Sequence, residues 1–274
     1  MDDVAGRTAF ITGGANGIGL GIARAFSRAG AKIALVDVDA EALGAARAEL
    51  AKDTEVEAFV LDVRDREAYA RAADEAEARL GPVSLLFNNA GVALSVPAEQ
   101  MSYEAWDFAL GVNLGGVVNG LQTFVPRMTA RSAQLHGGHV VNTASGAGLA
   151  TPGAGFLYHT AKFAVVGLSE ALRFELQGSG IGVSVLCPGP VATKIMHHTL
   201  RTQPASAPRP AAQMVEVVDA FLNSGASPDA VGEMVLRAVR ENALYIHTDR
   251  IMELPIQTRT KALLDALPPA QRRQ

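Results

Sequence analysis

The chain has 274 residues, of which 49% are hydrophobic and 19% charged, with a formal net charge of −4. This composition fits one large α/β domain and excludes an electrostatic affinity for nucleic acid, because basic residues are not clustered. The single cysteine, Cys187, excludes an internal disulfide. Because neither a secretion signal nor an apolar run of about 20 residues is recognisable, we expect a cytoplasmic protein without a membrane span, and we expect no metal site.

Short apolar runs rich in β-branched residues alternate along the chain with longer segments of helical period. Strands are expected at 7–12, 31–36, 56–61, 83–88, 138–144, 181–187 and 243–247, and helices at 17–29, 39–51, 65–80, 103–133, 156–177 and 227–240. This alternation is typical of a parallel sheet that is covered on both faces. With right-handed crossovers it predicts an α/β fold, a three-layer, doubly wound, parallel sheet of seven strands.

Two segments do not follow this alternation. Residues 189–226 contain three prolines between residues 204 and 210 and are expected to form a long irregular segment. Such a segment is either a functional lid or a disordered stretch, and we favour the lid. The tail 255–274 is expected to contain one or two amphipathic turns before a polar end. We therefore predict a single catalytic domain over residues 1–254, which includes the lid, and a helical tail over 255–274.

The first chemical motif is TGGANGIG at 12–19, between the first strand and the first helix. Gly13 permits a tight turn, Gly17 lets a diphosphate approach the backbone, and Gly19 allows the helix to pack closely. The N-terminus of the helix offers unpaired N–H groups and a partial positive charge. Because strand, turn, helix and a later carboxylate occur in this order, we expect a dinucleotide site rather than a glycine-rich turn without a ligand.

Asp37 is the later carboxylate and stands at the end of the second strand. There it would accept hydrogen bonds from the adenosine ribose hydroxyls and repel a 2′-phosphate, which favours NAD over NADP. Lysine and arginine are absent from positions 14–18 and 38, where they could bind such a phosphate. The alternative is that Asp37 caps the next helix, a role for which Asp39 competes.

A tyrosine and a lysine lie four positions apart in YHTAK, near the start of the helix expected at 156–177. Apolar residues at three- and four-residue steps make this segment helical, so Tyr158 and Lys162 project from one face. A free phenol titrates near ~10, and an adjacent ammonium, joined by an oxidised nicotinamide, would lower its pKa toward neutrality. On spacing alone, a surface tyrosine beside a solvated lysine remains an alternative.

Ser145 follows the fifth strand and so lies at the carboxyl edge of the sheet, where ligands bind in open α/β folds. Together, Ser145, TGxxxGIG at 12–19, NNAG at 88–91, VN at 112–113, YxxxK at 158–162 and PGPVAT at 188–193 resemble the short-chain dehydrogenase/reductase family over about residues 5–250. This resemblance implies a Rossmann fold and an NAD-dependent oxidoreductase that interconverts a secondary alcohol and a ketone.

The resemblance also implies roles for single residues. Tyr158 would be the general acid/base, Lys162 would lower its pKa and hold the nicotinamide ribose, and Ser145 would orient the substrate oxygen. Asn113 would secure a water that links the lysine to solvent, with hydrogen bonding inside a helix as the alternative. His159 is expected to face the substrate or to pack. Cofactor contacts are expected at Gly13, Asn16, Gly17, Ile18, Gly19, Asp37, Asp62, Val63, Asn89, Ala90, Gly91, Tyr158, Lys162, Pro188, Gly189, Val191 and Thr193.

The substrate and the assembly are the least determined features. An apolar pocket for an aryl or alicyclic alcohol is predicted from Ile195, Met196 and Leu200 in the lid and from Leu94, Val96, Leu149 and Phe156. Stretches such as VVNGLQTFVPRM resemble bacterial dehydrogenases that oxidise the benzylic alcohol of lignin-derived aryl ethers. The alternatives are an NADPH-dependent ketone or 3-oxoacyl reductase of the same fold and a dinucleotide-binding sensor without turnover. Apolar helix faces and the resemblance imply a homotetramer, or else a homodimer.

Overall fold

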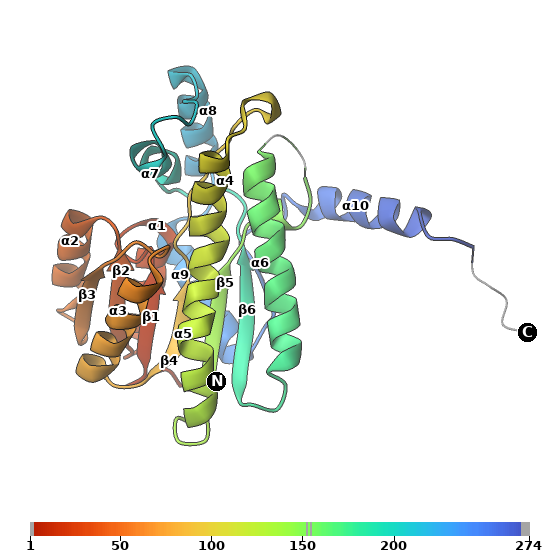
Figure 1. Cartoon of the computed structure of the whole chain (residues 1–274). Coiled ribbons are helices and arrows are strands. Elements are labelled where there is room, and N and C mark those ends of the chain that lie inside the picture. The colour runs from red at the N-terminus through yellow and green to blue at the C-terminus, as the bar shows by residue number, and fades with distance from the viewer. Residues whose placement is uncertain (1–2, 152, 154, 270–274) are drawn as a thin grey trace, which may run out of the picture.

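A parallel sheet forms the centre of the molecule in the computed structural model, which describes residues 3–151, 153 and 155–269 (Figure 1). Within these residues the sheet has seven strands in the order β3-β2-β1-β4-β5-β6-β7. The strands are β1 (Thr8–Thr12), β2 (Lys32–Asp37), β3 (Val56–Val60), β4 (Val83–Asn88), β5 (Gly138–Thr143), β6 (Ile181–Cys187) and β7 (Tyr245–His247). All neighbouring pairs are parallel, so the predicted doubly wound sheet is confirmed.

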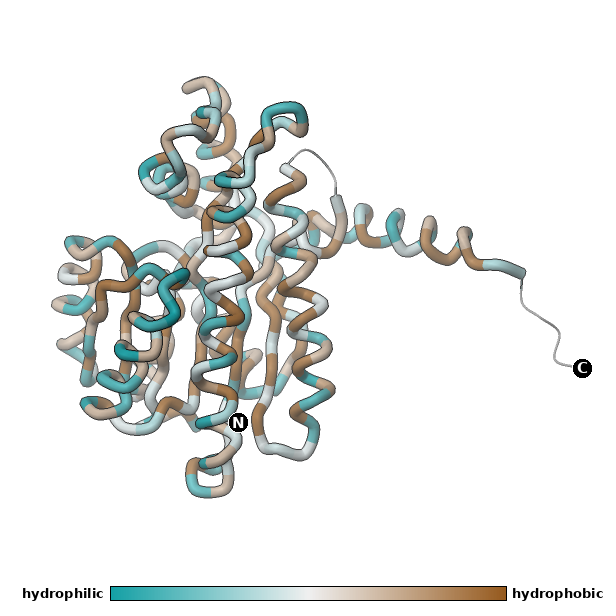
Figure 2. Tube along the Cα trace, viewed as in Figure 1, coloured by the Kyte–Doolittle hydropathy of each residue, from teal (hydrophilic) through white to brown (hydrophobic). Residues whose placement is uncertain are grey.

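Helices cover both faces of this sheet, and the apolar residues concentrate between the layers (Figures 1 and 2). One face carries α1 (Gly17–Arg28), α2 (Ala40–Leu50) and α9 (Pro228–Glu241), and the other carries α3 (Arg66–Leu80), α5 (Gly116–Arg131) and α6 (Phe156–Glu175). Side chains alternate between the faces along β1: Ala9 and Ile11 belong to one core cluster, whereas Phe10 packs against Tyr69 and Phe124 in the other.

The helix expected at 103–133 is interrupted. It consists of α4 (Tyr103–Leu110), a π-helical turn (Gly111–Gly115) and α5. Among the described residues, Tyr103–Arg131 is the one helix that is long and apolar enough to cross a membrane. Within the sandwich, however, this helix packs against β4 and α3, and Phe124 and Met128 on it are buried. The core of the fold therefore accounts for its apolar side chains.

The lid, residues 189–226, is not irregular, and this part of the prediction was wrong. It contains α7 (Ile195–Thr202) and α8 (Ala212–Asn223), which stand beyond the carboxyl ends of the strands (Figure 1). Pro204, Pro208 and Pro210 suggested a loop, but all three lie in the connection between the two helices. There they remove no helical hydrogen bond.

The tail also has more structure than predicted. α10 (Glu253–Asp265) is a continuous helix that extends away from the sandwich (Figure 1). Pro255 lies in its first turn, where the N–H that proline lacks has no partner inside the helix, so it does not end the helix. The predicted domain boundary after residue 254 falls inside α10. Residues 1–2 of the predicted domain and 270–274 of the predicted tail lie outside the described residues.

Two glycines allow α1 and α9 to approach each other closely. A Cβ added to Gly21 would lie 2.0 Å from the Pro228 carbonyl oxygen, and one added to Gly232 would lie 2.1 Å from the Gly21 carbonyl oxygen. Both contacts are with backbone atoms, which cannot rotate away as a side chain could. The separation of the two helices therefore depends on the missing side chains.

Replacing Gly21 by alanine is expected to destabilise the protein by about 1–3 kcal/mol or more, because the two helices must separate. Gly44→Ala in α2 is the matched control: a Cβ there meets nothing within 4 Å, so alanine is expected to stabilise the exposed helix by about 1 kcal/mol. Urea denaturation measures both variants. A Gly21→Ala protein as stable as the wild type would contradict the role of this crossing.

Candidate active site

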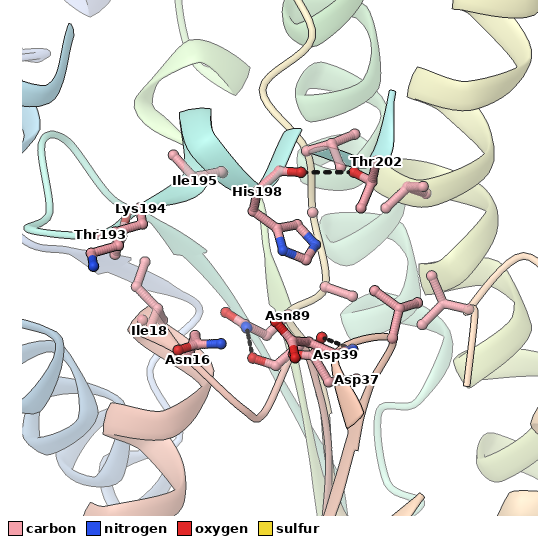
Figure 3. A pocket seen from close by; sticks show the side chains of 18 of the residues that line it. Asn16, Ile18, Asp37, Asp39, Asn89, Thr193, Lys194, Ile195, His198 and Thr202 are labelled. Carbon is pink, nitrogen blue, oxygen red and sulfur yellow. Dashed lines mark hydrogen bonds between the residues drawn. The ribbon is translucent and has the colours of Figure 1, made fainter. Parts of the chain in front are cut away.

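A cavity of about 850 Å³ opens at the carboxyl end of the sheet. It lies beside the point between β1 and β4 where the strand order reverses, which is where ligands bind in doubly wound folds. Figure 3 shows Ile195 and His198 of α7 on one side of the cavity and Asn16, Asp37 and Asn89 on the other. Its volume lies in the upper part of the range that is typical of small-molecule pockets, about 300–1,000 Å³.

Most of the residues predicted to contact a cofactor line this cavity. They are Gly13, Asn16, Gly17, Ile18, Asp37, Asp62, Val63, Asn89, Ala90, Gly91, Tyr158, Lys162, Pro188 and Thr193. Gly19, Gly189 and Val191 do not line this cavity. Gly19 is within α1, the Gly189 N–H donates to Thr248, and the buried Val191 forms a bridge with Ala226. Their predicted contacts with a cofactor stay predictions.

The turn from β1 into α1 depends on glycine at two positions. Gly13 has φ +63°, a conformation that glycine adopts without strain, and a Cβ on it would lie 2.9 Å from Ala90 Cα. A Cβ on Gly19 would lie 2.0 Å from the Gly13 carbonyl oxygen. The turn therefore brings bare backbone and the unpaired N–H groups of the α1 N-terminus to the cavity. These groups fit the diphosphate of a dinucleotide.

Asp37 is held at the rim of the cavity. Its Oδ2 accepts from the Ala15 N–H at 3.2 Å and its Oδ1 from the Asp39 N–H at 3.2 Å. The alternative role as helix cap is excluded, because Asp39 is the N-cap of α2 and accepts from the Ala42 N–H at 3.1 Å. Each Asp37 oxygen keeps a lone pair for a ligand, as ribose binding would require.

Tyr158 and Lys162 project from the first turns of α6, and Lys162 Nζ lies 5.5 Å from the centroid of the Tyr158 ring. The side chains of Tyr158 and Ser145 lie close together, and Ser145 lowers the pKa of the Tyr158 phenol. The Oγ of Ser145 accepts from the Ala147 N–H at 3.1 Å, which fixes the orientation of this side chain. The fold thus brings together three of the four predicted catalytic residues.

Burial dominates the electrostatics of these residues. It raises the pKa of the Tyr158 phenol, and Ser145 counteracts this only in part. Burial also lowers the pKa of Lys162 to about 8, and its Nζ donates to the Thr143 carbonyl oxygen at 2.9 Å. In the protein alone, the predicted lowering of the Tyr158 pKa by Lys162 is therefore not found, because burial raises this pKa and the Lys162 ammonium donates to Thr143 on β5. The further lowering by an oxidised nicotinamide stays a prediction.

Asn113, the fourth predicted catalytic residue, lies in the π-helical turn and does not line the cavity. Its Oδ1 accepts from the Val92 N–H at 3.1 Å, and its Nδ2 donates to the carbonyl oxygens of Val92 at 2.9 Å and Ala109 at 3.0 Å. The bond to Ala109 agrees with the alternative of hydrogen bonding inside a helix, whereas the two bonds to Val92 tie the helix to the segment after β4. A role in securing a water stays a prediction.

Some contacts of the site could not be predicted from the sequence. His159 donates from Nδ1 to the Ala147 carbonyl oxygen at 2.8 Å and so ties the turn that carries Ser145 to α6. Arg64 and Arg201 add positive charge to the cavity wall. His159 and Arg201 act through residues of other segments, Ala147 and Asp39, and local patterns give no sign of such contacts. Arg64 instead pairs with Asp62, two positions before it.

The predicted apolar substrate pocket is present only in part. Ile195 lines the cavity, and Met196 and Leu200 are half-buried on α7. Leu94 and Val96 are instead 2% exposed and belong to a core cluster, against which Phe156 packs, and Leu149 packs on another core cluster. The prediction for Leu94 was wrong, because its side chain belongs to the core. Val96 and Phe156, by contrast, line a second cavity of about 720 Å³ together with His159 and Phe163 of α6.

Known proteins resemble the whole chain. Residues 7–204 match the family model of the short chain dehydrogenases. The C alpha-dehydrogenase of Sphingobium sp. strain SYK-6 is 40% identical over 99% of this chain and 90% of its own length. The apo form of LigD from the same strain is 38% identical with a TM-score of 0.80, covering 98% of this chain and 100% of that one. A short chain dehydrogenase/reductase from Burkholderia phymatum in complex with NAD is 31% identical, with a TM-score of 0.89 over all of both chains.

Proposed function

The chain belongs to the short-chain dehydrogenase family, and from this premise we propose that it is an NAD-dependent enzyme that interconverts an apolar secondary alcohol and a ketone. Membership makes it an oxidoreductase whose fold binds a nicotinamide dinucleotide. The expected resemblance to dehydrogenases of aryl-ether alcohols is confirmed by the relatives named C alpha-dehydrogenase and LigD. The coenzyme preference, the catalytic roles and the substrate class are the proposal.

The convergence of Ser145 with Tyr158 and Lys162, of which the last two line the large cavity, carries this proposal. In alcohol oxidation, Tyr158 takes the hydroxyl proton while Ser145 orients the reacting oxygen. Bound oxidised nicotinamide would accept the hydride and add a positive charge. The Tyr158 phenol needs that charge, because burial raises its pKa and the Lys162 ammonium points at Thr143.

The remaining cavity residues fit the other parts of the coenzyme. The α1 N-terminus and Gly17 suit the diphosphate, and Asp37 suits the hydroxyls of the adenosine ribose. Lys162 would hold the nicotinamide ribose. The complex of the Burkholderia phymatum relative with NAD supports the same preference for this chain.

We expect faster turnover with NAD than with NADP when both are supplied at equal, subsaturating concentrations. The purified protein is assayed by NADH or NADPH absorbance against a panel of benzylic, other aryl and alicyclic secondary alcohols. Faster turnover with NADP would contradict the role of Asp37 and favour the reductase alternative. Binding of NAD without turnover of any alcohol would favour the dinucleotide sensor.

Among these alcohols, we propose a benzylic aryl alcohol as the substrate. The similarity to a C alpha-dehydrogenase over nearly the whole chain supports this choice, as do the apolar Ile195, Met196 and Leu200 on the lid helix. The outer surfaces of the helices support a homotetramer or homodimer, because Val118 on α5 and Phe174 on α6 are exposed. A cytoplasmic location and the absence of nucleic-acid and membrane partners remain part of the proposal.

A further inference from the structure

An ion pair joins the lid helix α7 to the side of the cavity on which Asp37 lies. Arg201 Nη2 on α7 lies 2.7 Å from Asp39 Oδ2 on the β2–α2 connection, and both residues line the cavity. The same Nη2 donates to His198 Nδ1 at 3.2 Å, and Figure 3 shows the His198 ring between α7 and Asp39. A guanidinium from the lid is thus held at the part of the cavity that would bind the adenosine ribose.

Asp39 is itself fixed by two further hydrogen bonds. Its Oδ1 accepts from the Ala42 N–H as the N-cap of α2, and its own N–H donates to Asp37 Oδ1 at 3.2 Å. The hydrogen bond from Ala42, followed by the contact with Arg201, lowers the pKa of the Asp39 carboxyl, so it is ionised at neutral pH. Because Asp39 bonds both to Asp37 and to Arg201, it holds the Arg201 guanidinium near the Asp37 carboxylate.

An arginine at this place has a chemical consequence for coenzyme choice. Guanidinium groups bind phosphate by charge-assisted, bidentate hydrogen bonds, and NADP differs from NAD by a phosphate on the adenosine ribose. The Asp39 carboxylate already occupies the Arg201 guanidinium and adds a negative charge near Asp37. The Arg201 side chain is 61% exposed, so this ion pair contributes little to the stability of the fold.

We propose that Asp39 is a second determinant of coenzyme choice: it occupies Arg201 and thereby prevents this lid residue from binding the 2′-phosphate of NADP. Asp37 repels that phosphate directly, whereas Asp39 acts by neutralising the one cation of the lid helix placed to attract it. The inference rests on the proposed function, because it presupposes a dinucleotide in this cavity. It names a specificity residue that acts through another side chain.

Asp39→Asn separates the charge of Asp39 from its structural role. Asparagine caps a helix as well as aspartate does, so α2 keeps its N-cap while Arg201 loses its partner. Calorimetry at low ionic strength measures the affinities of ADP-ribose and of 2′-phospho-ADP-ribose, which requires no turnover. A hydrogen bond to a charged group is worth about 1.5–3 kcal/mol, so the affinity for the 2′-phosphorylated ligand relative to ADP-ribose is expected to rise by about tenfold or more.

The double variant with Asp39→Asn and Arg201→Ala is expected to lose this gain, because the gain depends on the freed guanidinium. Glu41→Gln is the matched control: Glu41 lines the same cavity in the first turn of α2, and its substitution removes the same charge without a change at Arg201. The relative affinity of Glu41→Gln for the 2′-phosphorylated ligand is expected to rise by less than that of Asp39→Asn.

Three results would overturn the inference. In the first, Asp39→Asn does not raise the affinity for the 2′-phosphorylated ligand relative to ADP-ribose. In the second, the double variant shows the same rise in relative affinity as Asp39→Asn. The third is an equal gain in Glu41→Gln, which would point to a general effect of charge. Wild-type protein that binds neither ligand would overturn the proposed function and this inference together, whereas normal binding of ADP-ribose with one of the three results would overturn the inference alone.

Discussion

Replacing Tyr158 by phenylalanine is expected to lower kcat for alcohol oxidation by about 10²–10⁴-fold, the range that general acid–base catalysis contributes. The substitution removes one hydroxyl and leaves the ring beside Lys162. NAD is therefore expected to bind with nearly unchanged affinity. Initial rates followed by NADH absorbance, together with calorimetry of NAD binding, measure the two effects separately.

Tyr103→Phe is the matched control for this variant. It makes the same chemical change at a tyrosine of α4 that is 88% exposed, so kcat is expected to stay at the wild-type value. A Tyr158→Phe enzyme with full activity would refute the role of the hydroxyl. A large loss of NAD affinity would instead show that the hydroxyl acts mainly in binding, since an interaction made only in the transition state changes kcat alone.

The strands and the pairing of Tyr158 with Lys162 follow from local patterns. Each strand is a short apolar run, and a spacing of four residues places two side chains on one helix face whatever surrounds the helix. The order of strand, glycine turn, helix and Asp37 was likewise enough to predict a dinucleotide cradle. These features depend on residues that are close together in the sequence.

Features that depend on distant residues were not predictable in this way. The lid helices were obscured by prolines that lie between them, and the hydrogen bonds of Asn113 to Val92 link two segments that only the fold brings together. In the protein without coenzyme, the pKa of Tyr158 is raised and not lowered, because burial outweighs the effect expected from Lys162. The distance from Lys162 can be inferred from helix geometry, but burial and the Thr143 carbonyl that accepts from Lys162 Nζ cannot.

Lys162→Met is expected to abolish most of the activity and to make the protein more stable at pH 7. The side chain of Lys162 is 3% exposed, and burial lowers its pKa from 10.5 to about 8. Such a shift corresponds to about 3 kcal/mol of cost for the buried ammonium. Methionine fills a similar volume without charge. It leaves the Thr143 carbonyl without this donor, which costs about 1–2 kcal/mol, so a net gain of about 1–2 kcal/mol is expected.

The stability of the wild type depends on pH because the pKa of Lys162 is about 8 in the folded protein and 10.5 in the unfolded chain. Below pH 8 the lysine is charged in both the folded and the unfolded wild type, so the folded state bears the full cost of burial. Between pH 8 and 10.5 the folded state loses its proton first, the unfolded state binds more protons, and the wild type becomes more stable as the pH rises. The advantage of Lys162→Met is therefore expected at pH 7 and should shrink through this window.

Urea denaturation of both proteins at pH 7 and pH 10 tests this expectation, because groups other than Lys162 titrate alike in both and cancel in the difference. A variant that is less stable than the wild type at pH 7, or a stability difference that does not change with pH, would contradict it. A buried ammonium that destabilises its own fold needs a compensating role. Here Lys162 stands beside Tyr158 on the wall of the cavity, which is where a positive charge would serve the proposed chemistry.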